Sequence, residues 1–364
     1  MKLKADRVWQ IAAGDTERNY AALCLHWDVA LMGPGRFGPW KKETPYTRGQ
    51  TGDTARKITV IKRFCEEIQD GDLVVLRIGT TSACGVGVVC GDTQWNDYFG
   101  DVDGWDLQHV RRVKWLWKQN KDFSTYALKW GDTVQRLTSK PVLDWINTLE
   151  IPDSEEKRNL VELPESPGVQ RETAETIAEY LFDQGIASHS IRELTNEISE
   201  LARIAKWYQS ACNPSESETV AYLVIPLLRA LGWTPQKMAI EWHNVDIALF
   251  RSLPRDTKNL AAVVEAKRKG LSCLTAKSQA QGYAEKHGSA LCRRLIVTDG
   301  LRYAVFFLTK QGFEEHPRAY LNLTDMRSEY PVYECGGAKE AFLLMSGDWI
   351  ESARGEPTTP PTVQ

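Results

Sequence analysis

Two carboxylates and a lysine in the last third of the chain have the types and spacing for metal-assisted hydrolysis. Asp246 interrupts the apolar run EWHNVDIALF (241–250), and Glu265 and Lys267 follow the apolar start of NLAAVVEAKRKG (259–270). Strand side chains alternate between faces, so Glu265 and Lys267 point the same way, about 7 Å apart. Charges at the end of a buried strand are costly unless they bind a metal or each other.

The chemistry that this spacing allows is hydrolysis of a phosphodiester. Asp246, Glu265 and the carbonyl of Ala266 supply the hard oxygen ligands that Mg²⁺ prefers, with Mn²⁺ as a substitute. Such a metal lowers the pKa of a bound water and neutralises charge on the phosphodiester, while Lys267 orients the nucleophile or stabilises the transition state. For an isolated Glu-x-Lys a salt bridge is the simpler interpretation, so the surrounding elements must decide.

A third carboxylate precedes these strands on an expected helix. SESETVAYLVIPLLRALGW (215–233) has apolar residues at helical spacing and ends at Gly232. Glu216 lies in line with the apolar face, whereas Glu218 falls on its flank and can form a capping box with Ser215. This favours Glu216 as the inward carboxylate and leaves Glu218 as the alternative.

The order Glu216, Asp246, Glu265-Ala266-Lys267 resembles the PD-(D/E)xK nuclease superfamily. In detail, residues 211–310 look like the amino-terminal nuclease domain of type I restriction enzyme R subunits, including a Gln-Ala-Gln-Gly-Tyr-Ala helix motif and a closing strand pair, LIVTDGLRYAVF. The resemblance implies an α/β restriction-endonuclease-like core that binds Mg²⁺. The catalytic residues that it implies are Glu216, Asp246, Glu265, Lys267, Gln279 and Tyr283.

The sequence departs from that family at two positions. Val245 stands where the family usually has a proline before the strand aspartate, and Val220 stands where it has an arginine. The first change removes no ligand, and the second weakens the expectation of a DNA contact. Because no GxxxxGK[ST] motif occurs, we expect a nuclease without a built-in translocase.

The first 150 residues have a different character. Short apolar runs at 7–14, 72–79 and 85–92 are bounded by Gly and Asp and predict strands, and 57–72 has helical spacing. Nine of the thirteen tryptophans lie in this segment. We therefore expect a small mixed or β-barrel domain with aromatic side chains in its loops.

Two of these loops, 26–40 and 93–107, concentrate aromatic residues among glycines and acids. Rigid aromatic faces are suited to stacking a planar ring, although tryptophans in a small domain commonly serve the core. The segment from about 5 to 130 looks like the EVE-like branch of the PUA superfamily, whose small β-barrel recognises modified bases. The candidates for such a pocket are Trp27, Trp40, Trp95 and Trp105.

An acidic connector separates the two modules. Residues 151–210 carry 6 basic and 12 acidic side chains, and VELPESPG (161–168) reads as a linker. Two helices are expected, over about 170–183 and from a capping box at Ser190 onward, and their apolar stripes form an intramolecular hairpin or a dimer seam.

The resulting architecture is α+β and multidomain: residues 1–150 read modified bases, 151–210 connect, 211–350 form the nuclease, and 351–364 are a disordered tail.

Composition narrows the class of protein further. The net charge of the chain is −3, which excludes a protein that holds an anionic partner by an overall positive charge. No apolar stretch is long enough for a membrane span. The eight cysteines and six histidines form no metal-ligand cluster, which predicts a reduced, cytoplasmic protein with structural or surface histidines.

Together these expectations describe a modification-dependent restriction endonuclease that acts on double-stranded phage DNA carrying modified bases, with a homodimer as the candidate assembly. The alternatives are a repair or RNA-processing nuclease and a non-catalytic nucleic-acid-binding regulator with a nuclease fold. Which modification is read and where cleavage falls are left open.

Overall fold

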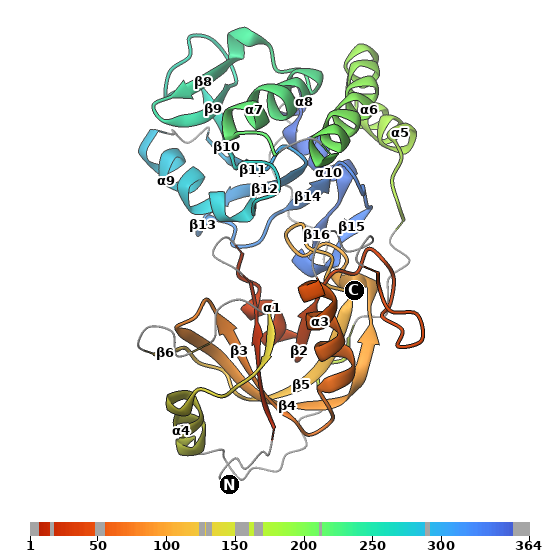
Figure 1. The fold of residues 1–364 in the computed structure, drawn as a ribbon. Coiled ribbons are helices and arrows are strands. Elements are labelled where there is room, and N and C mark those ends of the chain that lie inside the picture. Colours follow the sequence, from red (N-terminus) through yellow and green to blue (C-terminus); the bar gives the residue numbers. More distant parts are fainter. Residues whose placement is uncertain are drawn as a thin grey trace. The chain divides into compact units, whose positions relative to one another are not determined.

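The computed structural model describes residues 7–14, 18–47, 55–123, 128, 133–149, 160–163, 170–210, 213–287 and 292–351. The chain divides into two units, Met1–Pro167 (unit 1) and Gly168–Gln364 (unit 2), each drawn in Figure 1. Most of the expected linker and of the expected tail lies outside the described residues. Both units combine helices with a mixed β-sheet, which confirms the α+β class at this level.

Unit 1 is built on a seven-stranded sheet in the order β2-β5-β4-β3-β1-β7, with β6 paired to β4. Only β1 and β3 run parallel, and the other pairs are antiparallel. The strands are β1 (Val8–Ala12), β2 (Val29–Met32), β3 (Leu73–Ile78), β4 (Ser82–Trp95), β5 (His109–Trp117), β6 (Lys121–Asp122) and β7 (Val134–Arg136).

The expected barrel is not closed. Within the described residues, the edge strands β2 and β7 each pair with one neighbour and not with each other. Apolar runs between turn residues mark buried strands, but closure depends on strand tilt and on the register between the first and last strands. The expectation of a barrel is therefore wrong, although the strands themselves are present. The sequence did not show this because strand tilt and register have no local signature.

The helices of unit 1 are α1 (Ala21–His26), α3 (Ala55–Lys62) and α4 (Lys140–Thr148). The helix expected at 57–72 is shorter: α3 continues as a π-helical turn over Arg63–Glu67 and then stops. A buried arginine on β5 holds this turn. Arg111 donates to the carbonyls of Phe64 at 2.8 Å, Cys65 at 3.0 Å and Gly91 at 3.0 Å.

Replacing Arg111 by methionine is expected to lower the free energy of unfolding by about 3 kcal/mol, because three carbonyls lose a charged donor. Urea unfolding followed by tryptophan fluorescence measures the change. Lys121→Met is the matched control, since Lys121 is exposed on β6. A loss for Arg111→Met no larger than for Lys121→Met would show that the arginine does not support the fold.

Unit 2 is built on a nine-stranded sheet in the order β15-β16-β14-β12-β11-β10-β9-β8, with β13 paired to β12. β10 and β11 run parallel, as do β14 and β16, and the other pairs are antiparallel. The strands are β8 (Met238–Trp242), β9 (Val245–Phe250), β10 (Leu260–Ala266), β11 (Arg294–Thr298), β12 (Arg302–Thr309), β13 (Gly312–Phe313), β14 (Ala319–Asn322), β15 (Glu329–Tyr330) and β16 (Cys335–Gly336).

The apolar run 241–250 is not one strand. β8 ends at Trp242, and His243 and Asn244 form the turn into β9 with φ of 51° and 71°. A two-residue turn with both φ values positive matches the twist of a hairpin, and asparagine tolerates this conformation. His243 therefore lies in the turn between the two strands and on neither of them.

Helices cover both faces of this sheet (Figure 1). Buried residues of α5, α6, α8 and α10 share a core cluster with Ile247, Leu249 and Val264 on one face. Alanines of α9 share another cluster with Ala248 and Val263 on the opposite face. The helices are α5 (Ala174–Asp183), α6 (Ser188–Ser210), α7 (Glu216–Thr219), α8 (Ile225–Ala230), α9 (Lys277–His287), α10 (Ala338–Met345) and α11 (Gly347–Glu351), and a π-helical turn over Val220–Val224 joins α7 to α8.

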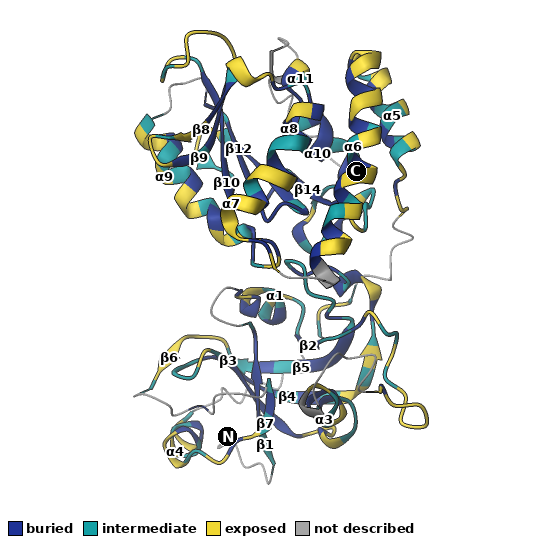
Figure 2. Cartoon of the chain, turned by 45° about the horizontal axis from the view of Figure 1, so that its top comes forward, coloured by how far each residue is buried: buried dark blue, intermediate teal, exposed yellow. Residues whose placement is uncertain are grey.

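The two helices of the expected connector belong to unit 2. The apolar stripe of α6, including Leu194 and Leu201, is buried in the same cluster as Leu223 and Leu227. Figure 2 shows α5 and α6 with buried and exposed sides, as expected for helices with one covered face. The stripe is thus covered within the chain and not by a second copy. α6 begins at Ser188, so the capping box expected at Ser190 is wrong.

The capping box expected at the start of the following helix is confirmed. Ser215 and Glu218 form a reciprocal capping box, with N–H to side-chain distances of 3.1 and 2.7 Å. Pro226 lies in the first turn of α8, directly after the π-helical turn, where its missing N–H costs little. In the described parts of the chain, no helix is both long and apolar enough to span a membrane.

Candidate active site

Asp246 and Glu265 lie on neighbouring strands. The antiparallel register pairs Ala248 with Val263 and Ile247 with Val264, and continuing it brings Asp246 opposite Glu265. Directly opposed residues of an antiparallel pair project from the same face of the sheet. That face is the one covered by α9, since Ala248 and Val263 pack in the cluster that contains its alanines.

The backbone of Ala266 fixes the aspartate. Its N–H donates to Oδ2 of Asp246 at 2.8 Å. The N–H and C=O groups of one strand residue point toward the same edge, so the Ala266 carbonyl also faces the side of Asp246. On the other side of β10, the N–H of Lys267 donates to the carbonyl of Thr298 at 2.7 Å. The structure therefore groups the three oxygen donors that the sequence predicts as metal ligands.

Glu265 is a buried carboxyl with an unsatisfied atom. Its side chain belongs to a residue that is 1% exposed, and no described hydrogen-bond donor reaches Oε2. Burial, and next the negative charge of Asp246, raise the pKa of Glu265 to about 8, an effect that Lys267 partly offsets. An unsatisfied carboxylate oxygen beside a second carboxylate is the environment that a divalent cation compensates.

Lys267 reaches across to α9. Its Nζ donates to Oε1 of Gln279 at 3.0 Å, and Nε2 of Gln279 lies 3.5 Å from the hydroxyl of Tyr283. Gln279 and Tyr283 are one helical turn apart, so both side chains project from the same side of α9. The structure thus brings together Asp246, Glu265, Lys267, Gln279 and Tyr283 of the sequence-predicted catalytic set.

Glu216 does not join this group. It is exposed in the first turn of α7, and Glu218 is occupied by the capping box. Within the described residues, no group of three or more His, Cys, Asp or Glu side chains is placed to hold a metal ion. α7 nevertheless lies close to the end of β10, because Oγ1 of Thr219 accepts from the N–H of Lys269 at 3.1 Å. The two carboxylates at the strand ends are accordingly the acidic part of the site.

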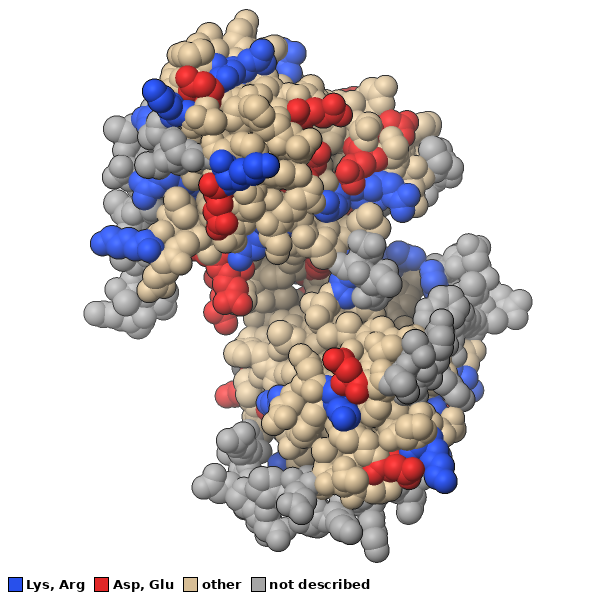
Figure 3. Space-filling view, turned by 90° about the vertical axis from the view of Figure 1, so that its left-hand side faces the viewer, with Lys and Arg blue, Asp and Glu red and all other residues tan. Residues whose placement is uncertain are grey.

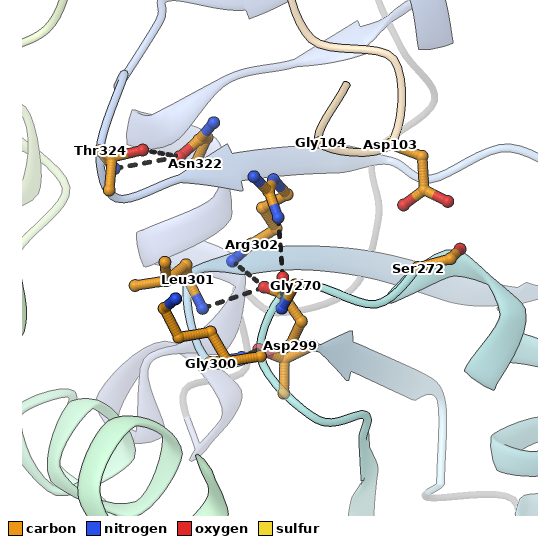
Figure 4. Close-up of polar contacts among 12 residues, drawn as sticks. Asp103, Gly104, Gly270, Ser272, Asp299, Gly300, Leu301, Arg302, Asn322 and Thr324 are labelled. Atoms are coloured by element: carbon orange, nitrogen blue, oxygen red, sulfur yellow. Dashed lines mark hydrogen bonds and ion pairs between the residues drawn. The ribbon is translucent and has the colours of Figure 1, made fainter. Parts of the chain in front are cut away.

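A buried aspartate beside the site escapes sequence-based prediction. Figure 4 shows Asp299 accepting from the backbone N–H groups of Gly270, Leu301 and Arg302, at 3.1, 3.1 and 2.8 Å, and pairing with Nη1 of Arg302 at 2.7 Å. Asp299 is fully buried. It ties the segment after Lys267 to the turn between β11 and β12. Its signal is the Asp-Gly pair between two apolar runs, which marks a turn but not this role.

The four candidate tryptophans of unit 1 are all half-buried, but they do not form one group. Trp27 packs edge-on against Tyr98, with ring centroids 5.4 Å apart. Trp105 packs against Tyr20 at 5.9 Å and lies under the guanidinium of Arg18. These two therefore have separate neighbours.

Trp40 and Trp95 share a neighbour, His109. The backbone N–H of Trp40 donates to Nε2 of His109 at 3.0 Å, and the Trp95 ring packs edge-on against the imidazole at 5.0 Å. Their indole N–H groups are also anchored, by Glu66 at 2.9 Å and Asp97 at 2.8 Å respectively. Both rings are thus fixed in orientation.

His109 links the two tryptophans as a neutral ring. It is 2% exposed, and burial lowers its pKa to about 4. Since it is neutral at pH 7, Nε2 can accept the hydrogen bond from Trp40. Nothing in the sequence distinguishes His109 from the other scattered histidines, apart from its position directly after the tryptophan-bearing loop 93–107.

Other tryptophans of unit 1 have structural roles. Trp9 and Trp115 are buried, and their indole N–H groups donate to Asp72 at 2.8 Å and to the carbonyl of Cys24 at 3.0 Å. Trp117 and Trp145 pack on each other with centroids 4.9 Å apart. Among the four candidate tryptophans, Trp40 and Trp95 are the two that contact a common residue, His109.

Comparison with known protein families gives a match within unit 1. Residues 9–141 match a family described as a domain of unknown function, DUF8426. These residues span the sheet of unit 1 and the candidate tryptophans, and they include no residue of the Asp246–Glu265 site. No curated protein is significantly similar to the chain.

Proposed function

We propose that this protein is a Mg²⁺-dependent DNA endonuclease of modification-dependent restriction, in which unit 2 hydrolyses phosphodiester bonds. The observation that carries the proposal is the grouping of Asp246, Glu265 and Lys267 around a buried carboxylate oxygen with no hydrogen-bond partner. A Glu265–Lys267 salt bridge alone does not account for it, because the ammonium of Lys267 is directed to Gln279.

Each group has a definite task in this proposal. Asp246, Glu265 and the carbonyl of Ala266 would hold Mg²⁺, or Mn²⁺ in its place. When bound, the metal supplies a water of lowered pKa and neutralises charge on the phosphodiester. Gln279 holds the Lys267 ammonium beside these ligands, where it can contact a phosphate oxygen, and Tyr283 positions Gln279.

The arrangement of unit 2 supports the proposed relation to PD-(D/E)xK nucleases. The acidic residues come from adjacent strands β9 and β10 at the point where β10 ends, and the lysine follows two residues later. Helices pack on both faces of the sheet, and α9 supplies the glutamine and tyrosine. Such a nuclease has one metal centre per chain, so cutting both strands would involve a second copy.

Unit 1 would select the DNA as an EVE-like, PUA-related reader of a modified base. The half-buried rings of Trp40 and Trp95, fixed through Glu66, Asp97 and His109, can stack with a planar base. Lysine and arginine are interspersed with acidic and uncharged surface on the face in Figure 3. With a net charge of −3, this chain would not bind all DNA indiscriminately, which is what a host needs from a restriction nuclease.

The test is cleavage of matched DNA duplexes that contain cytosine, 5-methylcytosine, 5-hydroxymethylcytosine or its glucosylated form, in Mg²⁺. We expect cutting of at least one modified duplex and not of the unmodified one. Trp40→Ala and Trp95→Ala should each lower cutting of the modified duplex about tenfold or more, because base stacking is worth about 1–3 kcal/mol. Trp207→Ala is the control, since Trp207 is 57% exposed in unit 2.

The other outcomes separate the alternatives. Equal cutting of all duplexes would leave the nuclease and remove cytosine-modification sensing. Preferred cutting of RNA, or of damaged DNA, would favour an RNA-processing or repair nuclease. Nucleic-acid binding without any cutting, in Mg²⁺ or Mn²⁺, would favour the non-catalytic regulator.

A further inference from the structure

One side of α9 continues from the site without being covered by the sheet. Gln279, Gly282, Tyr283 and Lys286 are spaced at three and four residues, so they share one side of the helix. Gln279, Gly282 and Lys286 are exposed and Tyr283 is half-buried. Ala280 and Ala284 form the buried side against the sheet. We call the four residues the α9 stripe.

Gly282 in the stripe has no structural reason to be glycine. It lies in the middle of a regular helix, where glycine is less favourable than alanine. A Cβ atom added at Gly282 would meet no atom within 4 Å, so close packing inside the chain does not exclude a side chain there. The remaining physical use of such a glycine is close approach of a ligand to the helix backbone.

The charges next to the stripe fit a polyanion. Lys267 contacts Gln279 at one end, and Lys286 lies about 10 Å further along the helix, at 1.5 Å per residue. The one acidic residue of α9, Glu285, borders the stripe at Gly282, on the side away from Lys286, and accepts from Nε2 of Gln281 at 2.8 Å. A nucleic-acid strand along the α9 stripe would contact the cationic side chains of Lys267 and Lys286 and the neutral side chains between them.

The far end of α9 is attached to the hairpin that carries Asp246. The rings of His287 and His243 stack with centroids 5.1 Å apart and planes 17° from parallel, and Trp242 packs edge-on against both. α9 is therefore braced at both ends: by Gln279 to Lys267, and by His287 to the β8–β9 turn. A strand bound on the stripe would have a fixed position relative to Asp246.

We infer that the DNA strand flanking the cleaved phosphodiester runs along the α9 stripe, with its sugar-phosphate backbone against Gly282 and a neighbouring phosphate at Lys286. This inference rests on the proposed nuclease function and adds the path of the substrate over unit 2.

Gly282→Ala tests the inference because its effects on folding and on binding are opposite. Alanine favours the helix and should raise Tm by about 2 °C, yet its methyl group should weaken binding of duplex DNA about tenfold. Gly282→Glu should weaken it further by repelling phosphate. Ser199→Ala is the matched control: Ser199 is exposed on α6, which packs on the sheet face opposite α9, so the substitution should raise Tm and leave binding unchanged.

Binding is measured with the full chain carrying Asp246→Asn to prevent cutting, using a labelled duplex of about 30 base pairs at low salt, where phosphate contacts dominate affinity. Cleavage is measured in parallel without that substitution. Equal affinity and cleavage for Gly282→Ala and Ser199→Ala would overturn the stripe and leave the nuclease standing. If the parent protein neither binds nor cuts DNA, the proposed function fails and the inference fails with it.

Discussion

The Glu265→Gln protein is expected to be more stable than the natural protein when no metal is present, by about 3 kcal/mol at pH 7. The cause is the pKa of Glu265, which burial and the charge of Asp246 raise from 4.5 to about 8. Each unit of that shift corresponds to about 1.4 kcal/mol of differential stability between pH 4.5 and pH 8. Glutamine has the shape of the protonated carboxyl and carries no charge at any pH.

The sign of the pH dependence follows from the direction of the shift. A carboxyl whose pKa is raised in the folded state holds its proton more tightly there than in the unfolded chain. The contribution of Glu265 to stability is thus fully present below pH 4.5 and is lost as pH rises toward 8. The natural protein should lose stability across this window relative to Glu265→Gln, and the two should converge near pH 4.

Urea unfolding in EDTA at several pH values measures this difference. Glu329→Gln is the control, because Glu329 is exposed on β15 and its loss should change little. Adding Mg²⁺ should stabilise the natural protein and not Glu265→Gln, since a ligand that binds the folded state raises its stability. A Glu265→Gln protein less stable than the natural one at pH 7 would mean that the buried carboxyl is satisfied without a metal.

Lys267→Ala is expected to lower the rate of DNA cleavage by about 10³-fold, the loss typical for removing one group that stabilises developing charge. Asp246→Asn should lower it at least as much. The two substitutions should differ in metal binding: Mg²⁺ should still raise the stability of Lys267→Ala, whose ligands Asp246, Glu265 and Ala266 are intact, and should not raise that of Asp246→Asn.

Single-turnover cleavage and calorimetric Mg²⁺ titration give the two readouts. Lys310→Ala is the control, since Lys310 is exposed in the turn after β12. Undiminished cleavage by Lys267→Ala would remove the lysine from the chemistry and leave it only a hydrogen-bond partner of Gln279.

The predictability of this site from sequence differs from residue to residue. The spacing of Glu265 and Lys267 on a strand determines that they share a face, and α-helical spacing does the same for Gln279 and Tyr283. Whether Asp246 lies opposite Glu265 depends on the register between β9 and β10, which are joined by residues 251–259 and whose pairing is irregular between Leu260 and Ala262. Neither feature can be read from the apolar runs. The neighbours of Glu216 depend on packing between helix and sheet, which periodicity does not specify.

Unit 1 shows the same limit. Its strands follow from short apolar runs between turn residues, but the open edges β2 and β7 and the association of Trp40 with Trp95 through His109 depend on which distant segments meet. The roles of Arg111 and Asp299 are equally nonlocal, since each bonds backbone groups from segments far apart in the sequence.

Residues of α5 and α6 are buried in the core of unit 2, so a gene fusion that transfers unit 2 to another protein must include both helices. A segment starting at residue 211, where the nuclease-like motifs begin, would leave Leu223 and Leu227 without the residues of α6 that cover them. The transferable piece instead begins before Ala174. Exchange of unit 1 during evolution would therefore succeed at junctions ahead of α5, and the two helices would be inherited with unit 2.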